Sequence, residues 1–262
     1  MWPDYETLQI DLDPPFVQVT LNRPEVRNAM NHQMVEDLIA VFGVLRERDD
    51  IRAAILRGAR GTFCAGGDFD ELRAAIDMDE AQQIARTARV DTMLRTINHA
   101  PLITIAVVDG AALGGGFGLV CVTDVAIAST AARLGLPEVR LGLVPAVISP
   151  YVIGRVGLTR ARQLMLTGSR FDGVAAQEYG IVHEALPPDG LDVRLEGLKE
   201  EIRQCAPNAV RECKKLIFEV VDKSPDETRQ SRAELLNRLR VGDEAQEGIL
   251  AFMQRRPAKW AE

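Results

Sequence analysis

Cysteine and histidine are scarce in this chain of 262 residues, which has four cysteines and three histidines. The cysteines are scattered and form no CxxC pair, so the sequence has no zinc signature and fits a reducing compartment. Its first residues, "MWPDYETLQI", show no basic region followed by an apolar run, so we expect no secretion signal and a cytoplasmic location. The apolar stretches are too short and too interrupted by glycine to predict a membrane-spanning helix.

Positive charge is also in short supply, because 31 lysines and arginines stand against 38 aspartates and glutamates. The net charge of −7 argues against a general nucleic-acid or acidic-membrane binder, and an anionic ligand would need a locally basic site. Hydrophobic residues make up 47% of the chain, which provides for a large core. The length suits one large domain or one domain with an appendage.

The order of patterns along the chain predicts an α/β fold. Strand patterns alternate with helical ones in the first half, which favours a layered sheet with mainly parallel pairing. Asn31 is expected to cap one helix, and a second helix is expected over about 79–98. After about residue 144 the strand signal nearly vanishes and helical patterns follow, one of them over 226–252. The strands are expected at "LQIDL", "FVQVTL", "IRAAILRG", "LITIAVV" and "DVAIAS".

The run "AALGGGFGLV", residues 111–120, places four glycines in five positions after a strand pattern. It lacks the lysine of a P-loop and the spacing of a dinucleotide fingerprint, and the chain has no GxSxG nucleophile elbow. A glycine turn between strand and helix aims unpaired N–H groups at a negative oxygen, as in an oxyanion hole. Close packing of the turn explains the glycines equally well. A second such turn, in "GTFCAGGDFDEL" at 61–72, can supply a second N–H to the same oxygen.

Three blocks, "FCAGGDFDEL", "DGAALGGGFGLVCVTDVAIAS" and "LGLPEVRLGLVP", resemble those of the crotonase superfamily, the enoyl-CoA hydratases and isomerases. The opening "VTLNRPEVRNAMN" and the closing "EGILAFMQRRPAKW" are similar to that family's terminal blocks. The resemblance implies an α/β, crotonase-like ββα spiral core over 1–190. It also implies a C-terminal helical oligomerisation region over 191–262, and a homotrimer or a hexamer built from two trimers.

The resemblance also implies an acyl-CoA substrate, with no separate cofactor, no metal and no nucleic-acid or membrane partner. The N–H groups of Gly67 and Gly115 would polarise the thioester carbonyl. Solvated surface arginines and ordinary helix packing remain alternatives for the charged and aromatic members of the CoA set. By position, the residues around CoA would be Arg27, Ala29, Ala65, Asp68 and Phe69, joined by Phe252 and Arg255 on a neighbouring subunit.

Glu138, in "LPEV", matches one of the two glutamates of the hydratase pattern, whereas Gly118 stands where the other would be. Hydration by Glu138 and isomerisation with Glu138 as the sole acid/base both remain open, as does a non-catalytic acyl-CoA- or RNA-binding protein of this fold. The "NRPEVRNAMN" and "AFMQRRPAKW" blocks favour hydratase. Loss of a side chain at 118 predicts added space and less negative charge in the substrate pocket, and hence a branched or carboxylated, glutaconyl-type enoyl-CoA.

Other polar residues near these blocks have structural interpretations. Asp124 is expected to cap a helix end, and His183 is expected to be a structural histidine on an apolar segment. Asp70 and Glu71 are expected on a solvated helix face.

Overall fold

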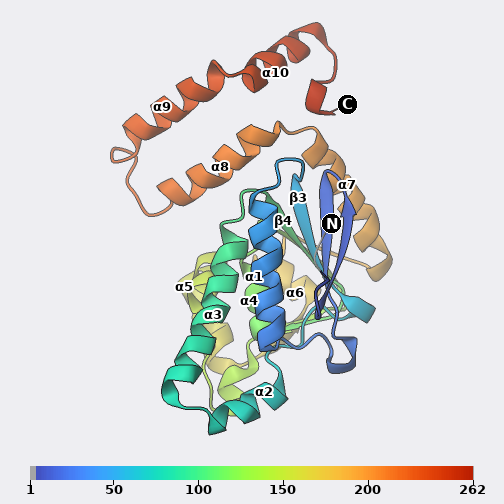
Figure 1. Cartoon of the computed structure of the whole chain (residues 1–262), viewed down its shortest axis with the longest axis vertical. Coiled ribbons are helices and arrows are strands. Elements are labelled where there is room, and N and C mark those ends of the chain that lie inside the picture. The colour runs from blue at the N-terminus through green and yellow to red at the C-terminus, as the bar shows by residue number, and fades with distance from the viewer. Residues whose placement is uncertain (1–3, 262) are drawn as a thin grey trace. The chain divides into compact units, whose positions relative to one another are not determined.

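The computed structural model describes residues 4–261 and divides the chain into two compact units, Met1–Arg194 and Leu195–Glu262 (Figure 1). The division falls four residues beyond the boundary expected at 190. No helix within residues 4–261 combines the length and the apolar character needed to cross a membrane.

A six-stranded sheet forms the centre of the first unit, in the order β1-β2-β3-β4-β6-β9. The first pair is antiparallel and the other pairs are parallel, as the strand–helix alternation predicts. All five strands expected from the sequence are present. The six strands are β1 (Leu8–Asp13), β2 (Phe16–Leu21), β3 (Ala53–Gly58), β4 (Ile103–Val108), β6 (Val125–Ser129) and β9 (Glu184–Leu186).

Helices α1 (His32–Arg46) and α3 (Glu80–Asn98) lie side by side in the first unit (Figure 1). The Asn31 side chain accepts a hydrogen bond from the Met34 N–H at 2.9 Å, which confirms the predicted cap of α1. Asp79 caps α3 in the same way, through the Gln82 N–H. The buried face of α1 carries the apolar residues whose spacing predicts a helix, namely Met34, Leu38, Val41, Phe42 and Leu45.

A small second sheet carries the glycine turn of interest. It consists of β5 (Ala111–Leu113), β7 (Arg133–Gly135) and β8 (Arg170–Asp172), with β7 in the middle. The prediction that strand structure nearly ends at about residue 144 missed β8 and β9. Each has three residues, which is too short for an alternating pattern to be seen in the sequence.

The remaining helices of the first unit are short, except for α5, which Gly157 interrupts with a non-helical conformation. The second unit is helical, as predicted, but the prediction of a single helix over 226–252 is wrong. Gly242 adopts an extended conformation and separates two helices there. The helices are α2 (Phe69–Ala74), α4 (Gly115–Cys121), α5 (Ser149–Thr167), α6 (Gly173–Glu178), α7 (Leu191–Arg203), α8 (Pro207–Val220), α9 (Arg229–Arg240) and α10 (Asp243–Gln254).

Candidate active site

The glycine run forms the turn between β5 and α4. Gly114 has φ +52° and ψ −118°, a conformation that side chains rarely allow, and its N–H donates to the Gly135 carbonyl on β7 at 3.0 Å. Gly115 is the first residue of α4. Its N–H therefore points out of the helix start, where a helix offers no acceptor of its own.

The second predicted turn lies directly beside the first. The Cys64 N–H donates to the Ala111 carbonyl at 2.8 Å, and the Leu113 N–H donates back to the Cys64 carbonyl at 3.0 Å. An ideal Cβ on Gly114 would lie 3.9 Å from the Gly66 Cα, so the two turns are in van der Waals contact. Within residues 4–261, no backbone hydrogen bond outside the regular helices and strands uses the N–H of Gly67 or Gly115. The two N–H groups meet the first requirement of an oxyanion hole, which is unpaired donors on adjacent turns.

Packing accounts for the other glycines of the run. An ideal Cβ on Gly116 would lie 2.5 Å from the Cys64 carbonyl oxygen, and one on Gly118 would overlap the side chain of Ile148. At Gly115, by contrast, the nearest atoms are the flexible end of Met30, at 3.7 Å. Conformation and packing therefore demand glycine at 114, 116 and 118, whereas the space at Gly115 is not explained by the fold.

Glu138 brings a carboxyl group to these turns. It lies in the 3-10 helix Pro137–Leu141, three residues after β7 ends at Gly135. Its Oε1 lies 2.9 Å from an ideal Cβ position on Gly114, and its buried Oε2 has no hydrogen-bond partner among the described residues. Burial raises the pKa of Glu138, against the effect of a backbone hydrogen bond. A half-buried carboxyl group with an unpaired oxygen beside two glycine turns suits general acid–base catalysis.

The expectation of added space at Gly118 is wrong. Ile148, which is 4% exposed, fills the volume that a side chain at 118 would occupy, and its Cβ lies 3.0 Å from the ideal Cβ position. The Ile148 carbonyl accepts the Val152 N–H in the first turn of α5, so the backbone that carries this side chain is fixed. Position 118 is therefore a packed apolar contact between α4 and the start of α5.

The predicted CoA residues of the first unit cluster around the Cys64–Gly67 turn. The Ala65 N–H donates to the Arg27 carbonyl at 3.1 Å, and the Arg23 guanidinium donates to the Ala29 carbonyl at 2.6 Å. Arg27 is exposed, with φ +55°, and Ala29 is buried. The turn and the "NRPEVRNA" loop thus form one surface, on which Arg27 offers a positive charge to an anionic ligand.

Asp68 and Phe69 open α2 next to this turn. The Asp68 carboxylate accepts the Asp70 and Glu71 N–H groups and an ion pair from Arg23 at 2.8 Å. Burial alone would raise the pKa of Asp68, but these hydrogen bonds together lower it. The Asp68 carboxylate thus has its hydrogen-bond partners within the chain. The sequence analysis did not identify Arg23 as one of them. Phe69 is 68% exposed, which leaves its ring able to contact a ligand.

Phe252 and Arg255 lie in the second unit, and their role toward CoA stays a prediction. Phe252 is 86% exposed, so packing of α10 against its own unit does not account for it. Arg255 ends α10 with φ +54°.

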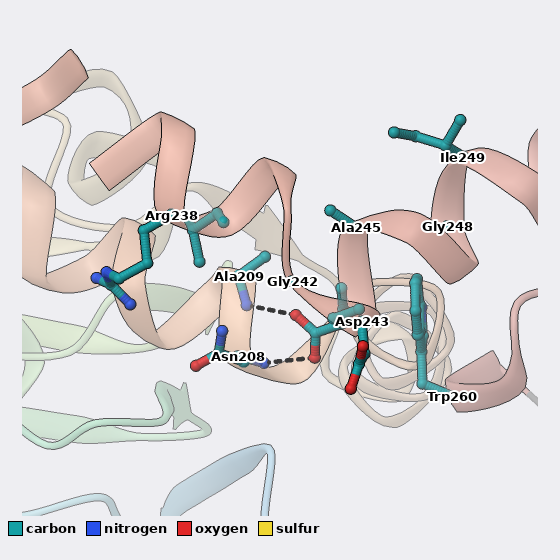
Figure 2. Close-up of a pocket in the computed structure, with 12 residues that line it drawn as sticks. Asn208, Ala209, Arg238, Gly242, Asp243, Ala245, Gly248, Ile249 and Trp260 are labelled. Atoms are coloured by element: carbon teal, nitrogen blue, oxygen red, sulfur yellow. Dashed lines mark hydrogen bonds between the residues drawn. The ribbon is translucent and has the colours of Figure 1, made fainter. Parts of the chain in front are cut away.

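The second unit has a pocket of its own, of about 500 Å³ (Figure 2). Glu244, at the start of α10, accepts the N–H groups of Asn208 and Ala209 at 2.9 and 2.8 Å, which ties α10 to the first turn of α8. The Trp260 ring lines the pocket beside Gly248, and its indole N–H donates to the Gln204 carbonyl. None of the predicted site residues lines this pocket.

Three structural interpretations from the sequence have different outcomes. His183 is confirmed as structural, since its Nδ1 accepts the Ala126 N–H at 3.0 Å. Asp124 does not cap a helix; its carboxylate accepts the N–H and hydroxyl of Thr104 and joins the end of α4 to β4. Glu71 is not simply solvated, because it accepts the first N–H of α1 at 2.8 Å.

The chain is similar to known proteins over nearly its whole length. Residues 15–262 match the family model described as enoyl-CoA hydratase/isomerase. A probable enoyl-CoA hydratase of Mycobacterium tuberculosis is 30% identical over 96% of each chain, and a trans-2-decenoyl-[acyl-carrier-protein] isomerase of Streptococcus mutans is 26% identical over 98% of each. The solved structure of Pseudomonas aeruginosa AtuE has a TM-score of 0.96 and 42% identity, covering 98% of this chain and 100% of that one. The chain therefore belongs to the enoyl-CoA hydratase/isomerase family of the crotonase superfamily, with the crotonase-like α/β fold that the sequence blocks predict.

Proposed function

We propose that this protein is an enoyl-CoA hydratase with an oxyanion hole formed by the Gly67 and Gly115 N–H groups and a single acid/base residue, Glu138. The observation that carries the proposal is the Glu138 carboxyl group, buried and unpaired at Oε2, beside the contact of the two glycine turns. A substrate thioester oxygen at the two N–H groups places its adjacent carbons toward this carboxyl group.

In this mechanism, water adds across the C2=C3 bond of the enoyl thioester. The Glu138 carboxylate takes a proton from the water, and the resulting hydroxide bonds to C3. The electron pair of the double bond moves onto the thioester oxygen, where the two N–H groups stabilise the enolate. Glu138, now protonated, returns a proton to C2. Loss of one such N–H donor typically costs about 10²–10³-fold in kcat.

The missing second carboxylate bears on the substrate through charge. A glutamate at 118 would repel a carboxylate on the acyl group, and the repulsion would be strong in a low-dielectric pocket. Gly118 with Ile148 removes that charge, which favours a carboxylated, glutaconyl-type enoyl-CoA. Position 118 gives no added space for a branched acyl group, since Ile148 fills it.

An enoyl-CoA isomerase is the second candidate, and the filled position at 118 favours it. With an apolar side chain in place of a second carboxylate, one base can move a proton between C2 and C4 without activating water. The isomerase among the relatives is consistent with either chemistry in this family.

A panel of enoyl-CoA thioesters tests both candidates. Linear, 3-methyl-branched and glutaconyl-type substrates are incubated with the protein, while absorbance of the conjugated thioester and product mass are followed together. Hydration lowers the absorbance and adds the mass of one water, whereas isomerisation changes the absorbance at constant mass. Tight acyl-CoA binding without turnover of any substrate would contradict both and support a non-catalytic binding protein. RNA retention in a filter assay would point to the RNA-binding alternative.

We also propose that the chain assembles as a trimer or as a hexamer of two trimers. Exposed apolar residues on α10 support an association surface, because monomers rarely expose such patches. Light scattering coupled to size exclusion tests the proposal, and a monomer at micromolar concentration would contradict it. The α10 residues concerned are Ile249, Leu250, Phe252 and Met253.

A cytoplasmic location stays a prediction from the scattered cysteines.

A further inference from the structure

The Ile148 side chain packs against Gly118, in the first turn of α4, which begins at the candidate oxyanion residue Gly115. The Gly118 N–H donates to the Gly114 carbonyl at 3.0 Å, so the two glycines are one helical turn apart. Glu138 approaches Gly114, and Ile148 approaches Gly118. Both side chains therefore approach the start of α4, Glu138 at its N-cap residue and Ile148 one turn further along.

We infer that Ile148 is a specificity-determining residue, which forms the apolar wall of the acyl site next to Glu138 and limits substitution at C3 of the substrate. This inference rests on the proposed function. An acyl group whose thioester oxygen lies at Gly115, the first residue of α4, passes Glu138 at C2. Its next carbons continue toward the following turn of α4, where the Ile148 side chain occupies the space beside Gly118.

Gly118 and Ile148 are interlocked, because each residue restricts which side chain the other position can carry. A side chain at 118 would overlap Ile148, and removal of the Ile148 side chain would open the space that Gly118 leaves. The closed arrangement supplies an apolar surface, and the opened one would admit extra substrate carbon or a second side chain. Ile148 therefore acts as a size filter for the acyl group of the substrate. The other buried core residues around it do not have this role.

The test uses Ile148→Ala and the milder Ile148→Val, compared with Ile51→Ala as a matched control. Ile51 is also buried, but it precedes β3 at the end opposite to the Cys64–Gly67 turn. Calorimetry measures binding of two unreactive saturated thioesters, butyryl-CoA and 3-methylbutyryl-CoA. One additional buried methyl group is worth about fourfold in affinity. Ile148→Ala should shift the ratio of the two Kd values about fourfold or more toward the branched thioester. Ile148→Val should shift it less, and Ile51→Ala should leave it unchanged.

Two outcomes overturn the inference. One is an unchanged Kd ratio in folded Ile148→Ala and Ile148→Val; the other is an equal shift in the Ile51→Ala control. Because binding is measured without turnover, these outcomes are distinguishable from failure of the proposed function. A wild-type protein that converts no enoyl-CoA, yet shows the shifted ratio in Ile148→Ala, would remove the hydratase proposal and leave Ile148 as the size filter.

A second experiment tests the interlock by thermal unfolding. Gly118→Glu alone should lower Tm by several degrees, because its side chain meets Ile148, and Ile148→Gly alone should lower it by leaving a cavity. The two changes together should lower Tm by less than the sum of the single effects. Additive losses would overturn the interlock.

Discussion

Gly115 and Gly116 are consecutive, and the structure predicts opposite outcomes for side chains at the two positions. An ideal Cβ on Gly115 meets only the flexible Met30 end at 3.7 Å, which is ordinary contact. An ideal Cβ on Gly116 lies 2.5 Å from the Cys64 carbonyl oxygen and 2.7 Å from the Cys64 Cβ. The Cys64 backbone cannot retreat, because it is bonded on both sides to β5.

The magnitudes follow from these distances. Gly116→Ala should cost about 1–3 kcal/mol, the usual range for overpacking a rigid core. For a chain of this size each kcal/mol corresponds to about 2–4 °C, so we expect Tm to fall by roughly 2–12 °C. Gly115→Val should leave Tm within about 2 °C, since an ideal Cβ at Gly115 meets no rigid atom within 4 Å. Its two added methyl groups should nevertheless crowd the thioester at the N–H, and kcat should fall about 10²–10³-fold, as for loss of one oxyanion donor.

The assay pairs thermal unfolding with turnover of the best enoyl-CoA substrate, and size exclusion confirms the oligomer of each variant. Gly115→Ala serves as a graded control, with the helix start kept intact and less crowding than valine. If Gly115→Val retains kcat within threefold of the parent, the Gly115 N–H does not hold the substrate oxygen. If Gly116→Ala unfolds at the parent temperature, the packing argument fails.

Two further predictions concern carboxyl groups. Glu138→Gln should lower kcat about 10²–10⁴-fold with CoA affinity nearly unchanged. Because burial raises the pKa of Glu138, the ionised carboxylate destabilises the folded state above that pKa. Glu138→Gln should therefore raise Tm near pH 8, and this gain should disappear below pH 4.5, the ordinary pKa of a glutamate. An equal gain in Tm at pH 8 and below pH 4.5 would refute this reasoning. Asp68→Asn keeps a capping oxygen but loses the charge that pairs with Arg23. Since the pKa of Asp68 is lowered, its charge stabilises the folded state above pH 3.8, the ordinary pKa of an aspartate. Asp68→Asn should therefore lower Tm near pH 7 by a few degrees, and the difference from the parent should shrink toward pH 3. A difference in Tm that does not change with pH would show that the ion pair contributes nothing.

The parts of the fold that depend on local chemistry could be predicted from the sequence. Asn31 marks the start of α1 because its side chain can satisfy only N–H groups a few residues ahead. Buried parallel strands such as β4 show as continuous apolar runs. The strands β8 and β9 could not be predicted, because three residues carry no period, and partners distant in sequence, β7 and β6, fix them in place. Gly242 is itself a sequence signal for the break between α9 and α10, but the helical pattern on both sides of it favours one continuous helix.

The site shows a similar division. The two glycine turns and Glu138 are visible in the sequence as blocks, and the structure brings all three together. The occupant of the space at 118 is not visible, because Ile148 lies 30 residues further along the chain and contacts Gly118 only through the fold. Arg23 was missed for the same reason, since its partner Asp68 is 45 residues away.

In the proposed mechanism, one carboxyl group must meet the electrostatic demands that two carboxylates would share. Two carboxylates in one site can hold opposite protonation states, so that one is base and the other acid at the same moment. In the proposed mechanism, with Ile148 filling the space at 118, Glu138 acts as base and acid in turn. That sequence is most efficient when the two states are close in free energy, which requires a pKa nearer to neutrality than that of an exposed glutamate. Burial of Oε2 without a donor supplies that shift, because a hydrogen-bond donor at Oε2 would favour the ionised form and oppose it. The unpaired Oε2 and the apolar packing of Ile148 on Gly118 are therefore both consistent with the proposal that one group moves the proton.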